Sequence, residues 1–234
     1  PAMSDLRRAA LIDSLRSTIR RLRWDPADTE WADYATNTSY ASSAAEAKDR
    51  VVEAMLAAAG GDVVWDLGAN TGRFSAIAAR LGRDVLAFDI DPGAAELHYR
   101  ALRAAGTTAI QPLVMDLANP SPGLGWAGAE RRPLADRANA DTILALALIH
   151  HLAIGRNVPL PAIADWFARL APHAIVEFVP KADPMVRFLL ESREDVFADY
   201  DLDGFRAAMA TRFELLEETP LPDSPRVLFH LRRR

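Results

Sequence analysis

Three acidic residues end three successive apolar segments, and a glycine loop follows the first of them. Asp66 lies near the end of residues 62–67, and the chain then turns through Gly68 and Gly72 into a helical pattern. Glycine lets a ligand approach the backbone closely, and the first turn of a helix offers free N–H groups. This arrangement predicts a ligand site at the carboxyl end of the first strand of an open α/β sheet.

The spacing of the loop and the acids limits which class of ligand could bind. A nucleoside triphosphate loop would need Lys after Gly72, and a dinucleotide loop would need Gly where Asn70 stands. Asp66 suits a positively charged group, such as the ammonium of an amino acid. Asp89 follows Gly72 by 17 residues, close to the spacing of about 20 for an acid that binds ribose hydroxyls. Asp116 could accept from an adenine amino group. Any one of these acids alone is more often a turn residue or a helix cap.

The elements that must position these residues alternate along the chain. Apolar strands are predicted at 62–67, 84–89, 108–115, 141–148 and 174–179, with helices at 71–81, 92–105 and 160–170. Such strands indicate a parallel sheet that is covered on both faces. Two further helices near 184–194 and 202–211 precede strands near 213–218 and 226–231. The fold class expected is therefore α/β, a Rossmann-like doubly wound sheet that an antiparallel hairpin closes.

The stretch D-L-G-A-N-T-G, followed by V-L-A-F-D-I-D, resembles the class I S-adenosylmethionine-dependent methyltransferase superfamily over about residues 43–234. The resemblance implies the strand order 3-2-1-4-5-7-6 with strand 7 antiparallel, and S-adenosyl-L-methionine as cofactor. It places the methionine part beside the loop, the ribose at Asp89 and the adenine at Asp116. The implied cofactor-binding residues are Asp66, Gly68, Asn70, Gly72, Asp89, Ile90, Asp116, Leu117 and Ala147.

Three residues near the ends of strands four and five are candidate catalytic groups. His150 and His151 follow the fourth strand, and a histidine can take a proton from an acceptor hydroxyl or amine. Adjacent residues on a helix point about 100° apart, so at most one of them is expected to face the reaction. Glu177 lies inside an apolar strand, where it could bind the acceptor, bond a histidine or form a structural ion pair. No metal is predicted, because paired ligands on a helix want i,i+4 spacing.

Four further residues are candidate contacts to the acceptor. Tyr34 and Tyr40 precede the core, where a lid could lie, and residues 1–42 are predicted to form a helical extension to a domain at 43–234. Trp126 lies in the long loop 117–135, and Lys181 follows the fifth strand. Six arginines between Arg7 and Arg23 give a basic helix, which could be a solvated face, a lid, a dimer arm or an anionic-partner patch.

Composition excludes several classes of function. The chain has no cysteine, which excludes disulfide bonds, catalysis by a thiolate and metal sites with cysteine ligands. Its formal net charge of −5 argues against a general nucleic-acid binder. No apolar run of about 18 residues predicts a membrane helix, and arginines stand where a signal peptide would need apolar residues. A cytoplasmic protein without a membrane partner is expected, and a homodimer is compatible with the sequence.

The sequence thus favours SN2 methyl transfer to an oxygen or nitrogen of a small-molecule metabolite, with a histidine as candidate base. Two alternatives stay open. One is a protein or peptide methyltransferase that grips a chain with loop 117–135, and the other is a non-catalytic cofactor-binding interaction protein.

Overall fold

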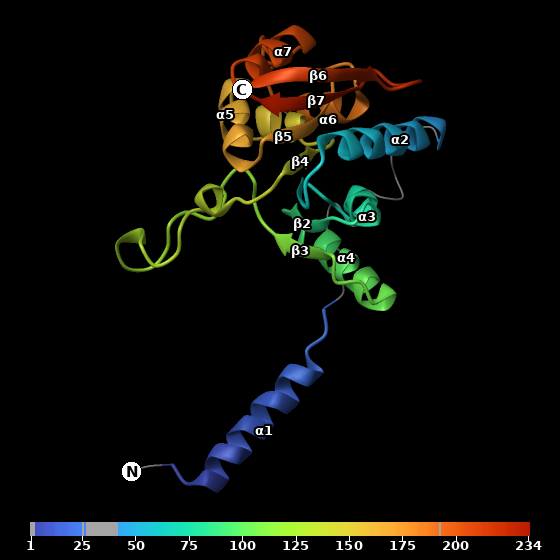
Figure 1. The fold of residues 1–234 in the computed structure, drawn as a ribbon. Coiled ribbons are helices and arrows are strands. Elements are labelled where there is room, and N and C mark those ends of the chain that lie inside the picture. The colour runs from blue at the N-terminus through green and yellow to red at the C-terminus, as the bar shows by residue number, and fades with distance from the viewer. Residues whose placement is uncertain (1–2, 25, 27–41, 192) are drawn as a thin grey trace.

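The computed structural model describes residues 3–24, 26, 42–191 and 193–234 (Figure 1). It contains a seven-stranded sheet in the order β3-β2-β1-β4-β5-β7-β6, and β7 pairs antiparallel with both of its neighbours. The predicted fold class and strand order are therefore confirmed. The strands are β1 (Val63–Leu67), β2 (Asp84–Asp89), β3 (Ile110–Val114), β4 (Thr142–Ala145), β5 (His173–Phe178), β6 (Phe213–Pro220) and β7 (Val227–Arg233).

Successive residues of the central strands point into two different apolar cores. Trp65 and Ile143 belong to one core, while their neighbours Val64 and Leu144 belong to the other. Side chains alternate along a strand with a period of two, so an apolar residue at every position is what a sheet covered on both faces requires. The unbroken apolar runs in the sequence reflect this arrangement.

Helices cover both faces of this sheet. Core residues of α2 (Ser42–Ala59) and α3 (Arg73–Arg80) pack on one face, and those of α5 (Leu160–Leu170) and α7 (Leu202–Ala210) pack on the other (Figure 1). Two further helices are α4 (Pro92–Ala105) and α6 (Pro184–Glu191). The predicted helix 92–105 has the bounds of α4, because Asp91 caps its N-terminus and Gly106 ends it in a left-handed conformation. Among the described residues, no helix combines the length and apolarity that crossing a bilayer would demand.

The basic N-terminal segment forms the predicted helix, α1 (Asp5–Arg21), but none of its residues is buried. Leu15 and Ile19 on this helix are 54% and 66% exposed. In Figure 1, α1 extends away from the sheet rather than covering it. The proposed boundary between residues 42 and 43 follows residues 27–41, which lie outside the described residues, so the division into an extension and a domain stays a prediction.

The largest difference from the expected elements follows the fourth strand. β4 ends at Ala145 rather than near residue 148, because Leu146 and Ala147 leave the sheet and Ala147 has a φ of 50°. The chain then forms a five-residue π-helix, η4 (His151–Gly155). The long loop 117–135 contains the 3-10 turn η2 (Trp126–Gly128) and leads into a second, η3 (Leu134–Arg137).

Candidate functional site

The loop after β1 is held tightly against the end of β2. Gly68 and Ala69 donate backbone hydrogen bonds of 2.8 and 2.9 Å to the carbonyl of Phe88. Gly68 and Gly72 have φ values of 77° and 85°, which a side chain would strain. A Cβ on Gly72 would also collide with the His98 imidazole of α4. Both glycines are thus required by the backbone path of this loop.

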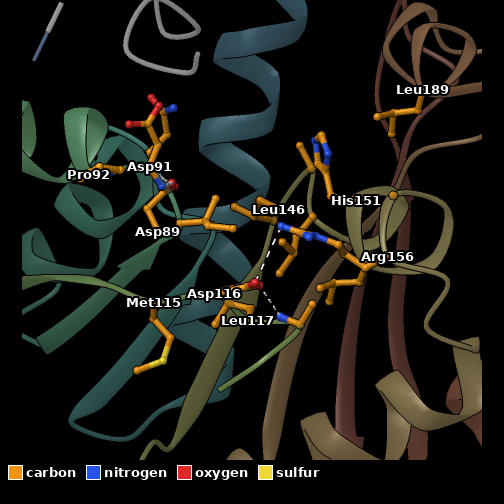
Figure 2. Close-up of a pocket in the computed structure, with 18 residues that line it drawn as sticks. Asp89, Asp91, Pro92, Met115, Asp116, Leu117, Leu146, His151, Arg156 and Leu189 are labelled. Carbon is orange, nitrogen blue, oxygen red and sulfur yellow. Dashed lines mark hydrogen bonds and ion pairs between the residues drawn. The ribbon is translucent and has the colours of Figure 1, made fainter. Parts of the chain in front are cut away.

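The ends of three strands meet beside this loop. The register of the sheet pairs Leu67 with Phe88 and Phe88 with Leu113, so β1, β2 and β3 end at the same edge. A cavity of about 610 Å³ opens there (Figure 2). This volume falls within the range of roughly 300–1,000 Å³ that small-molecule sites occupy. The predicted site residues that line it are Gly68, Asn70, Asp89, Ile90, Asp116, Leu117, Ala147 and His151.

Asp89 offers a fixed carboxylate to this cavity. Its Oδ2 accepts from the backbone N–H of Asn70 at 2.7 Å, and its Oδ1 accepts from that of Asp91 at 2.8 Å. Burial raises the pKa of Asp89, while these backbone donors oppose the shift. A carboxylate has about four lone-pair positions, so Asp89 keeps acceptor capacity for ligand hydroxyls.

Asp116 lines the cavity close to Asp89, because the preceding residue, Met115, donates a 2.7 Å backbone hydrogen bond to the Asp89 carbonyl. Asp116 Oδ1 accepts from the Ala118 N–H at 2.9 Å, and its Oδ2 lies 3.7 Å from Nη2 of Arg156 (Figure 2). Ile90 of the β2 end also lines the cavity and is 45% exposed. A polar acceptor beside apolar side chains matches the edge and face of a planar base such as adenine.

Asp66 lies in β1 just before the loop and Gly72 lies at its end, and neither is among the residues that line the cavity. Asp66 is 2% exposed, and its Oδ2 accepts a 2.6 Å hydrogen bond from the Ser75 hydroxyl. Burial raises the pKa of Asp66 to about 6. A direct contact from either residue to a cofactor stays a prediction.

The two adjacent histidines occupy different environments. His151 lines the cavity, whereas His150 is fully buried beside it, with ring centroids 4.1 Å apart. Burial, together with the charge of Arg226, lowers the pKa of His151 to about 4. Burial holds the pKa of His150 well below its usual value, and within the described part of the chain neither of its ring nitrogens has a hydrogen-bond partner. Both imidazoles are therefore neutral at physiological pH, and only His151 reaches the cavity.

Glu177 belongs to a buried ion-pair cluster and is not among the cavity-lining residues. Its Oε2 lies 2.6 Å from Lys48 Nζ, and its Oε1 lies 3.5 Å from Arg226 Nη1. Arg226 also pairs with Asp183, at 2.7 Å. Burial lowers the pKa of Lys48, while the charge of Glu177 opposes that shift. Of the roles left open by the sequence, these contacts favour the structural ion pair.

The predicted acceptor-binding residues do not gather at the cavity within the described part of the chain. Trp126 is 84% exposed on its loop. Lys181 forms a 2.8 Å ion pair with Asp195 and donates to the Phe197 carbonyl. Tyr34 and Tyr40 lie outside the described residues. The acceptor-binding roles of all four stay predictions.

Sequence reasoning missed two cations near the site. Lys48 would be expected in solvent, yet it is 4% exposed. Its spacing of four and seven residues from the core residues Val52 and Met55 places it on the buried face of α2, which is a signal the sequence did carry. Arg156 had no such signal, because the π-helix that places it has no recognisable sequence pattern.

No model of a known protein family matches the sequence. It is 37% identical over 232 residues to the nodulation protein NoeA of Rhizobium meliloti (strain 1021), a match that covers 96% of this chain. The chain spans about half of that relative, 47% of its length.

Solved structures with the same fold have low sequence identity. The PH0226 protein from Pyrococcus horikoshii OT3 matches with a TM-score of 0.63 and 14% identity, over 91% of this chain and 100% of that one. Magnesium protoporphyrin IX methyltransferase (ChlM) from Synechocystis PCC 6803, with bound SAM, matches with a TM-score of 0.56 and 16% identity. That match covers 86% of this chain and 89% of the methyltransferase. At these identities the matches establish a shared fold.

Proposed function

We propose that this chain, which has the fold of the class I S-adenosylmethionine-dependent methyltransferases, binds S-adenosyl-L-methionine and transfers its methyl group to a small-molecule acceptor. The observation that carries the proposal is the cavity at the carboxyl edge of β1, β2 and β3. Acceptor groups for a ribose and for an adenine, Asp89 and Asp116, lie there at the ends of adjacent strands, beside a glycine loop.

The residues of the cavity fit the proposed cofactor. Asp89 is fixed by two backbone donors and keeps acceptor capacity for the two ribose hydroxyls. Asp116 would accept from the adenine amino group, and Ile90 would pack on the adenine face. Gly68 brings the backbone close to where the methionine part would lie. When bound, the cofactor supplies a methyl group that is already activated on a sulfonium.

Alignment is the main contribution that this chain makes to the reaction. Holding a donor and an acceptor in line can contribute roughly 7–11 kcal/mol toward lowering a barrier. The loop after β1 and the turn after β4 both line this cavity, which suits this task. The acceptor atom would be an oxygen or a nitrogen.

His151 is the candidate general base. Its imidazole is neutral above a pKa of about 4 and lines the cavity, so it can accept a proton from the acceptor. A positioned base contributes about 10²–10⁴-fold to a rate, and the low pKa of His151 puts its contribution toward the lower end of that range, because base strength falls with pKa. No proton step is assigned to His150 or Glu177, because neither lines the cavity.

The test combines binding and transfer. Tritiated S-adenosylmethionine is incubated with the purified chain and either metabolite or protein fractions, and S-adenosylhomocysteine binding is measured by calorimetry. We expect label in a small molecule, and we expect His151→Ala to lower turnover by about 10²-fold with nearly unchanged cofactor affinity. His173→Ala serves as the matched control, because His173 pairs with His230 at 3.2 Å and does not line the cavity.

Other outcomes would change the proposal. Unchanged turnover in His151→Ala would remove the histidine base. Label in the protein fraction alone would favour a protein or peptide methyltransferase. Binding of S-adenosylhomocysteine without transfer to either fraction would favour a non-catalytic cofactor-binding protein.

A further inference from the structure

The π-helix η4 brings two polar side chains to the same cavity wall. It begins at His151 and ends at Gly155, and Arg156 follows directly. Asn157 then adopts a left-handed φ of 56°, which is uncommon for a residue other than glycine. Single π-turns and such backbone conformations concentrate at functional sites. Both His151 and Arg156 line the cavity, so this turn presents a neutral imidazole and a guanidinium to one ligand.

Arg156 is the only cation among the described residues that line this cavity, and three carboxylates accompany it: Asp89, Asp91 and Asp116. Asp89 and Asp91 are both buried and both accept hydrogen bonds from backbone N–H groups. Asp116 is the carboxylate that faces Arg156. Arg156 is therefore the positive charge that these lining residues offer to a ligand.

The ion pair between Arg156 and Asp116 is loose. Its shortest N–O distance is 3.7 Å, and the two side chains are 52% and 36% exposed. The buried pair of Lys48 and Glu177, by contrast, has a distance of 2.6 Å. Exposed pairs contribute little free energy, so a ligand can replace either partner of the Arg156–Asp116 pair readily.

We propose that Arg156 recognises an oxyanion, a carboxylate or a phosphate, on the acceptor, and that cofactor binding releases Arg156 from Asp116 for this purpose. The inference rests on the proposed function, because the adenine amino group is the donor that would take over Asp116. The acceptor is accordingly an anionic small molecule. Its anionic group lies at Arg156, and the atom that receives the methyl group lies near His151.

The chemistry of Asp116 and Arg156 supports this exchange of partners. The Ala118 N–H occupies one lone-pair position of Asp116 Oδ1, so Oδ2, the oxygen that faces Arg156, is the more open acceptor for a donor from the cofactor. Once displaced, the guanidinium has five N–H donors in a planar fork that matches an oxyanion. Apolar surface for the body of the acceptor is nearby, since Leu189 lines both this cavity and an adjoining one of about 300 Å³.

Coupling between the two ligands is the measurable consequence. If cofactor binding frees Arg156, an anion that binds Arg156 must in turn strengthen cofactor binding, since linkage is reciprocal. The probes are S-adenosylhomocysteine titrated by calorimetry into the full chain, with millimolar inorganic phosphate, acetate or chloride at equal ionic strength. Phosphate tests whether Arg156 recognises a phosphate group, and acetate tests whether it recognises a carboxylate.

We expect phosphate or acetate to tighten S-adenosylhomocysteine binding by roughly fivefold or more in the wild type. In Arg156→Gln, S-adenosylhomocysteine should bind at least as tightly as in the wild type in chloride, and neither oxyanion should change its affinity. Arg169→Gln is the matched control, because Arg169 forms an exposed 2.9 Å pair with Asp136 and does not line the cavity. It should keep the full effect of the oxyanion.

Two results would overturn the inference while leaving the proposed function standing. One is a wild type that binds S-adenosylhomocysteine with no effect of either oxyanion, and the other is an equal oxyanion effect in Arg156→Gln. A wild type that does not bind S-adenosylhomocysteine at all would overturn the proposed function, and this inference with it.

Discussion

Removing the cation Lys48 should destabilise the protein far more than removing an exposed cation. Its Nζ lies 2.6 Å from Glu177 Oε2, and the two side chains are 5% and 0% exposed. At an effective dielectric constant of about 20, the attraction between the two charges is about 6 kcal/mol. Much of this offsets the cost of removing both charges from water. Removing one partner, however, leaves the other charge buried.

We expect Lys48→Met to lower the free energy of unfolding by about 3–5 kcal/mol. Arg226 cannot fully replace the lysine, because its Nη1 lies 3.5 Å from Glu177 and it also pairs with Asp183. The double variant Lys48→Met/Glu177→Met removes both charges, so it should be more stable than Lys48→Met by about 1 kcal/mol or more.

Urea unfolding followed by circular dichroism measures these differences. Arg169→Met is the control, because its pair with Asp136 is exposed and should contribute only about 0–1 kcal/mol. The reasoning is refuted if Lys48→Met costs no more than this control. It is also refuted if the double variant is as unstable as the sum of its two single variants, because the charges would then not be coupled.

Two further predictions concern the glycine loop and the cavity histidine. Gly72→Ala should destabilise the protein more than Gly82→Ala in thermal unfolding. Both glycines have similar positive φ values, so the backbone strain of the two substitutions is comparable. A Cβ at Gly72 would collide with His98, whereas a Cβ at Gly82 would meet open space. Equal losses would show that the close approach to His98 has no consequence. Burial holds the pKa of His151 at about 4 in the folded state against 6.5 as its ordinary value. The native state therefore resists protonation, and this contribution to stability is lost as pH falls from 6.5 toward 4. The wild type should accordingly lose up to about 3 kcal/mol relative to His151→Gln across that interval in urea unfolding at several pH values. A pH-independent difference would contradict the low pKa.

Local sequence patterns were sufficient to predict most of the fold. α4 and α5 have the bounds that helical periodicity and their flanking residues indicate, and β2 has the bounds of its apolar run. Asp89 and Asp116 could be assigned to one site because parallel strands bring their carboxyl ends to one edge. In each case the relevant signal lies within a few residues of the feature.

The rest of the site depends on contacts that local patterns do not encode. Lys48 and Glu177 are 129 positions apart, and only the packing of α2 against β5 brings them together. His150 and His151 are equivalent in the sequence, yet the early end of β4 and the π-helix after it bury one and place the other on the cavity. The same turn positions Arg156, which no motif in the sequence indicates.

The central claim is that Asp89 binds the ribose of S-adenosylmethionine in the cavity at the edge of β1, β2 and β3. Calorimetric titration of S-adenosylhomocysteine into the wild type and into Asp89→Ala tests it most directly, with circular dichroism to confirm that the variant is folded. Hydrogen bonds to a charged group contribute about 1.5–3 kcal/mol each. We therefore predict that the wild type binds the ligand and that a folded Asp89→Ala binds it roughly 10–100-fold more weakly. No binding by the wild type, or equal affinity in the two proteins, would contradict the account.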